Sequence, residues 1–142
     1  MARTIDVHQH FLPDFFWRET NEGANPIGGI MPPPWTESTA LAFMDDAGID
    51  VAMLSISTPG VHVGDDTRAR ALARRCNEFA ARLVQSRPDR FGSFAALPLP
   101  DVDGALEELR YAFADCWVEH DDTQAVLEAL FPRQDSDVWP IA

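Results

Sequence analysis

The chain of 142 residues contains no lysine, only two cysteines and no long apolar run. Its formal charge of −12 leaves no basic surface of the kind that nucleic acids or anionic membranes require, so we expect neither as a partner. Cys76 and Cys116 are too few for a disulfide framework, and they indicate reduced thiols in a cytoplasmic protein. No apolar run approaches the roughly 20 residues of a membrane helix, and no secretion signal opens the chain.

Short apolar runs alternate with amphipathic stretches along the chain. The apolar runs predict strands over residues 4–8, 50–57 and 91–97. The amphipathic stretches predict helices over 36–47, over 65–86 and from 101 to about 113. The dense prolines and glycines of residues 11–35 predict an irregular loop. This βαβαβα order predicts an α/β fold with parallel strands and right-handed crossovers, and with functional loops at the C-terminal ends of the strands.

Capping residues mark the ends of the predicted helices. Thr36 is suited to begin the first helix, and Gly48 is suited to end it. Asp65 or Asp66 is expected to cap the second helix, and Asp101 or Asp103 the third. Capping accounts for Asp65 and Asp66 better than a metal site does.

A His-x-His pair, His8 and His10, lies at the end of the first predicted strand. Side chains alternate between the faces of a strand, so both imidazoles are expected on one side, where two neutral rings can share a metal ion. Asp6 has the same parity, and its carboxylate could orient a ligating ring. The alternative, a pair of surface histidines, is common for an isolated pair of this kind.

Four motifs in this order resemble a known family. Residues 6–13 (DVHQHFLP) are similar to the opening of the amidohydrolase superfamily. Residues 44–55 (MDDAGIDVAMLS), 76–80 (CNEFA) and 88–100 (PDRFGSFAALPLP) narrow the resemblance. They point to the amidohydrolase-related branch that contains aminocarboxymuconate-semialdehyde decarboxylase. The resemblance covers about residues 3–115.

The resemblance implies a (β/α)₈ TIM barrel, of which this sequence supplies the first three βα units. It implies one divalent metal ion, with Zn²⁺ expected, held by His8 and His10 at the C-terminal mouth. Members of the branch decarboxylate, hydrate or hydrolyse small carboxylated substrates, often aromatic or muconate-like. The remaining metal ligands and the acid–base groups come from later strands, which this sequence does not contain. His62, in the loop after the second strand, and Trp35, in the long first loop, are expected to face the substrate.

The last residues depart from the family pattern. We therefore divide the chain into the N-terminal part of the barrel, residues 1–115, and a divergent tail, residues 116–142. A truncated or frame-shifted product would have such a tail, and His120 within it is expected at the surface.

Two functional hypotheses from different classes follow. The first is a metal-dependent decarboxylase or hydrolase that acts on a small carboxylate. The alternative is a catalytically incomplete remnant, an α/β fragment that at most associates with itself through unpaired strand edges. A flavodoxin-like binding module fits less well, because no glycine-rich phosphate loop follows the first strand.

Overall fold

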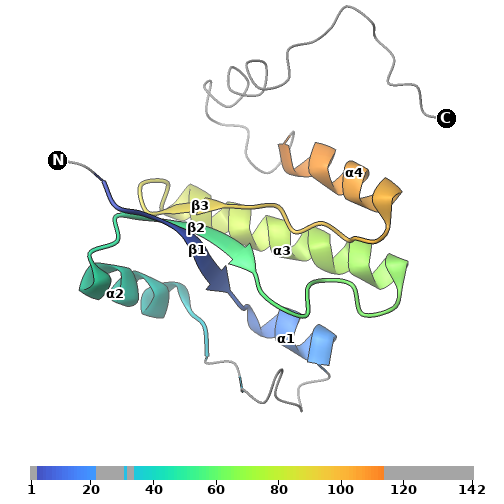
Figure 1. Cartoon of the computed structure of the whole chain (residues 1–142), viewed down its shortest axis with the longest axis horizontal. Helices are drawn as coiled ribbons and strands as arrows, with labels where there is room; N and C mark the ends of the chain where they lie inside the picture. Colours follow the sequence, from blue (N-terminus) through green and yellow to red (C-terminus); the bar gives the residue numbers. More distant parts are fainter. Residues whose placement is uncertain (1–2, 22–30, 32–33, 114–142) are drawn as a thin grey trace, which may run out of the picture.

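The computed structural model describes residues 3–21, 31 and 34–113. Its elements follow the order β1 (Ile5–Phe11), α1 (Asp14–Asn21), α2 (Glu37–Ala47), β2 (Val51–Ile56), α3 (Asp66–Ser86), β3 (Phe91–Ser93) and α4 (Val102–Tyr111). The strands form one parallel sheet in the order β1-β2-β3, which confirms the predicted alternation (Figure 1). No helix within these residues is long and apolar enough to cross a membrane.

The predicted caps are present at the three helices that follow the first loop. The side chains of Thr36, Asp65 and Asp101 each accept a hydrogen bond from the main-chain N–H three residues later. Gly48 ends α2 with a φ of 68°, a left-handed conformation that costs glycine little. A hydrogen bond of 2.5 Å from Arg70 is the main reason that the pKa of Asp101 lies below its usual value, so this cap remains ionised.

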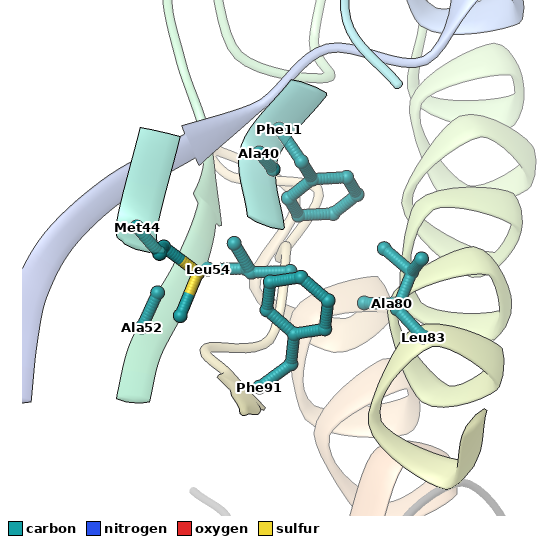
Figure 2. Packing of buried hydrophobic residues seen from close by; sticks show 8 residues of the cluster. All are labelled: Phe11, Ala40, Met44, Ala52, Leu54, Ala80, Leu83 and Phe91. Atoms are coloured by element: carbon teal, nitrogen blue, oxygen red, sulfur yellow. The ribbon is translucent and has the colours of Figure 1, made fainter. Parts of the chain in front are cut away.

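Helices α2 and α3 pack on one face of the sheet. The buried side chains between them are Phe11, Ala40, Met44, Ala52, Leu54, Ala80, Leu83 and Phe91 (Figure 2). On β2 the residues alternate, with Ala52 and Leu54 fully buried and Met53 and Ser55 half-buried. The sheet therefore has one face covered by helices and a second, more open face.

The prediction of an irregular segment over residues 11–35 was wrong for its first part, because α1 forms over Asp14–Asn21. Pro13 stands just before this helix, where its missing N–H costs nothing, and its carbonyl accepts a hydrogen bond of 2.9 Å from the N–H of Phe16. Phe16 is fully buried against Leu72 and Cys76 of α3. Packing of one aromatic side chain against α3 thus stabilises this helix, which the prolines of the local sequence do not predict.

The third strand ends earlier than predicted, at Ser93 instead of Leu97. The Phe94 N–H still donates to the Leu54 carbonyl of β2 at 2.9 Å, but at Ala96 the main chain bonds to a side chain. The Asn77 carboxamide accepts from the Ala96 N–H at 2.7 Å and donates to the Ala96 carbonyl at 3.0 Å. Asn77 also donates to Glu108 of α4 at 2.9 Å, so one buried amide joins α3, α4 and the segment after β3.

Removing the Asn77 carboxamide should destabilise the fold strongly. Asn77→Ala leaves the Ala96 N–H and carbonyl without their partner. It also removes a hydrogen-bond donor from the buried Glu108 carboxylate. We expect the free energy of unfolding in urea to fall by about 3 kcal/mol. The control is Glu107→Ala, which removes an exposed ion pair with Arg70 and should cost less than about 1 kcal/mol. Equal losses in the two variants would contradict this account of Asn77.

Cys76 is a buried free thiol, as its place on the apolar stripe of α3 predicts. Burial raises its pKa to about 12. An unfolded thiol ionises near pH 8.5, so the unfolded chain loses this proton first. The stability that the protonated thiol contributes is therefore fully present below about pH 8.5 and is lost as the pH rises toward the folded value. Cys116 lies outside the described residues.

The Cys76 thiol should be unreactive in the folded protein. In a Cys116→Ser background, a disulfide reagent such as DTNB should modify Cys76 at about pH 8 only after urea is added, because the thiolate is the reactive species. Modification of the native protein at the rate of the unfolded one would overturn the assignment of Cys76 to the core.

Candidate metal centre

The two histidines of the His-x-His pair lie at the C-terminal half of β1. Register pairs Asp6 with Ala52 and Gln9 with Leu54, so β1 carries one extra residue between these two pairs. Such a bulge interrupts the alternation of side chains and re-aims the residues around it. His10 then lies opposite Ser55 of β2, on the more open face of the sheet.

The imidazoles of His8 and His10 approach each other with the same ring nitrogen, Nε2. Their Nε2 atoms are 3.2 Å apart, and the ring planes meet at 83°. His8 is exposed and His10 half-buried, so the two nitrogens face an accessible position. The structure thus brings the predicted pair together on one side of the strand.

This arrangement fits a shared metal ion. Zinc–imidazole bonds are about 2.0–2.1 Å long, which places two nitrogens on a tetrahedral ion about 3.3 Å apart. The observed separation of 3.2 Å is close to that value. A neutral imidazole presents a lone pair at one nitrogen only, and in both rings the nitrogen nearest the common position is Nε2. Within residues 3–21, 31 and 34–113, no third His, Cys, Asp or Glu completes a metal-binding group.

The second nitrogen of His10 is held by Ser55, a residue that the sequence did not single out. The Nδ1 atom of His10 lies 3.0 Å from the Ser55 hydroxyl oxygen and 3.4 Å from the Ser55 carbonyl oxygen. Ligating histidines are commonly held in this way through the ring nitrogen that does not bind the metal.

Asp6 contacts the main chain of the pair instead of a ring. Its Oδ1 accepts a hydrogen bond of 2.9 Å from the backbone N–H of His8. The sequence predicted a ring contact from simple alternation, and the extra residue in β1 breaks that alternation after Asp6. The carboxylate instead holds the main chain at the bulge.

His62 contacts its own loop and Asp66, the first residue of α3. Its Nε2 lies 2.8 Å from an Asp66 carboxylate oxygen, and its Nδ1 accepts from the Gly64 N–H at 3.3 Å. Because Nδ1 accepts, the neutral ring carries its proton on Nε2 and donates it to Asp66. The predicted role of His62 toward a substrate therefore remains a prediction.

Trp35 packs on the core of the sheet. Its ring meets those of Phe11 and Phe79 edge-on, with centroids 6.2 and 6.0 Å apart. Phe79 in turn stacks on Phe11 and meets Phe15 of α1. Trp35 thus joins an aromatic cluster beside the C-terminal end of β1, and its predicted contact with a substrate stays a prediction. His120 lies outside the described residues.

Comparison with known proteins identifies the same family as the sequence motifs. The amidohydrolase family model matches residues 5–116. The 6-methylsalicylic acid decarboxylase acuB of Aspergillus aculeatus is 41% identical over 112 residues, which are 76% of this chain and 33% of the relative. The chain therefore spans about a third of the length of this curated relative.

Solved structures agree with this result. A crystal structure of an amidohydrolase II superposes with a TM-score of 0.71 and 32% identity, over 79% of this chain and 37% of the other. A dihydroxybenzoic acid decarboxylase from Polaromonas sp. JS666, with bound manganese and the inhibitor 2-nitroresorcinol, superposes with a TM-score of 0.60 and 30% identity. That match covers 82% of this chain and 36% of the other.

The sequence motifs, the parallel sheet and these matches lead to one assignment. The three βα units are the first part of a (β/α)₈ barrel, as the resemblance implied. This chain belongs to the amidohydrolase family.

Proposed function

We propose that His8 and His10 supply two ligands of a divalent metal centre in a decarboxylase of small hydroxylated aromatic acids. The separation of 3.2 Å between their Nε2 atoms is the observation that carries the proposal. The substrate class is supported by relatives whose names specify 6-methylsalicylic acid and dihydroxybenzoic acid. Hydrolysis, which the sequence left open, finds no support in these names.

The chemistry divides between the ion and the protein. When bound, a divalent ion supplies Lewis-acid stabilisation of the negative charge that develops as the carboxylate leaves the ring. His8 and His10 hold that position at the open end of β1, and Ser55 fixes the ring of His10.

The sequence favoured zinc, whereas a related decarboxylase holds manganese. Imidazole nitrogen is a good ligand for zinc, and manganese is better suited to sites that add carboxylate and water oxygens. We propose a divalent ion at this site, with zinc and manganese to be compared directly.

Metal binding and probe binding test the function together. The purified chain should bind about one Mn²⁺ or Zn²⁺, and His8→Ala and His10→Ala should each weaken binding by at least about 100-fold, since outer partners alone contribute 10–100-fold. His62→Ala is the matched control, because it removes an imidazole that bonds to Gly64 and Asp66 and not to the His-x-His pair. The chain loaded with Mn²⁺ should then bind 2-nitroresorcinol, detected by its absorbance, and the His8→Ala protein should not.

Sub-stoichiometric metal that is insensitive to His8→Ala would contradict the proposal and favour the non-catalytic alternative. Failure of the metal-loaded chain to bind 2-nitroresorcinol would contradict the substrate class alone.

We also propose that the chain associates with itself. Ile5 and Val7 of β1 are 56% and 65% exposed, and among the described residues β1 pairs only with β2. An exposed apolar edge strand is a site for pairing with another chain.

Sedimentation velocity over a range of concentrations should show species larger than a monomer. Ile5→Lys should shift the distribution toward the monomer, because an edge lysine opposes strand pairing. Phe43→Lys, at an equally exposed position on α2, is the control and should leave the distribution unchanged. A monomer at all concentrations would rule out self-association.

A further inference from the structure

We propose that Ser55 is a positioning residue that holds the proton of His10 on Nδ1, so that the Nε2 lone pair stays available to a metal. The role of Ser55 in metal binding rests on the proposed function. The position of the His10 proton does not, because it also holds for the metal-free protein.

Two oxygens of one residue meet Nδ1 of His10. The hydroxyl oxygen of Ser55, at 3.0 Å, can donate or accept, whereas its carbonyl oxygen, at 3.4 Å, can only accept. An unprotonated Nδ1 would place its lone pair against the carbonyl oxygen. The pair of contacts therefore favours a proton on Nδ1, which the hydroxyl and the carbonyl share as acceptors.

The strand pairing makes this contact possible. Ser55 is the register partner of His10, and the two residues occupy the same face of adjacent parallel strands. Ser55 interrupts the apolar run of β2 at a half-buried position. A hydroxyl here has a partner on the neighbouring strand, which accounts for a polar residue at that place in the sheet.

The position of the proton on His10 determines the tautomer of His8. Two Nε2 atoms 3.2 Å apart need one proton between them when no metal is present. Because Nε2 of His10 is unprotonated, the metal-free His8 carries its proton on Nε2 and donates it to His10. To ligate a metal ion through Nε2, His8 would have to release that proton to water and take one from water at Nδ1. Only His8 changes tautomer, and its exposed ring allows water to reach it.

Nitrogen NMR of the metal-free protein tests the proton positions directly. Long-range ¹H–¹⁵N spectra at about pH 8.5, where free imidazole is neutral, should show a protonated Nδ1 in His10 and a protonated Nε2 in His8. Addition of Zn²⁺ should move the proton of His8 to Nδ1 and leave the His10 tautomer unchanged. A protonated Nε2 in the metal-free His10 would overturn the inference.

Substitution of Ser55 tests its role. Ser55→Ala should give His10 a mixture of tautomers and weaken Zn²⁺ binding by about tenfold, the lower end of the range for such partners. Ser55→Thr, which retains the hydroxyl, should restore both properties. The control is Ser93→Ala on the adjacent strand, because the Ser93 hydroxyl donates only to the carbonyls of Leu54 and Phe94.

The outcomes separate the two proposals. Wild-type tautomer and affinity in Ser55→Ala would overturn the positioning role and leave the metal centre standing. The expected tautomers in a protein that binds no metal would support the role of Ser55 and overturn the proposed function.

Discussion

The parallel pairing of β1 with β2 is the interaction on which the candidate site depends. Its register places His10 beside Ser55. The extra residue between Asp6 and Gln9 affects the direction in which the histidine side chains project from the strand. The Asp6 carboxylate holds the His8 N–H at this bulge. Without this register His10 would lose its contact with Ser55, and both imidazoles would turn toward the face that the helices cover, since a shift of one residue reverses every side chain of a strand.

The packing on the other face holds that register in place. Phe11, one residue after His10, is buried with Leu54 of β2 and Phe91 of β3. Burial of an aromatic side chain of this size contributes about 2–3 kcal/mol. Helices α2 and α3 cover this face, and Asn77 connects α3 to the segment after β3. The apolar side of the sheet therefore contributes the stability, and the more open side carries the candidate metal centre.

Local sequence signals predicted most of the fold. The caps at Thr36, Asp65 and Asp101 and the stop at Gly48 follow from side-chain and backbone chemistry within four residues. The apolar run of β2 and the parallel order followed in the same way. Helix α1 was missed because Phe16 owes its position to residues of α3 far along the chain.

The candidate site was predictable only in part. The spacing of His8 and His10 placed both on one side, because that spacing matches the strand period. The roles of Ser55 and Asp6 depended on the register between two strands and on a bulge, neither of which sequence periodicity specifies. Trp35 packs among aromatic rings, and sequence alone does not say which apolar surface a loop residue will meet.

Anomalous diffraction from crystals grown with Mn²⁺ tests the central claim most directly. The account predicts one manganese peak at the end of β1 within bonding distance of Nε2 of both His8 and His10. The absence of a peak there, or a manganese ion bonded to one of these imidazoles alone, would contradict it.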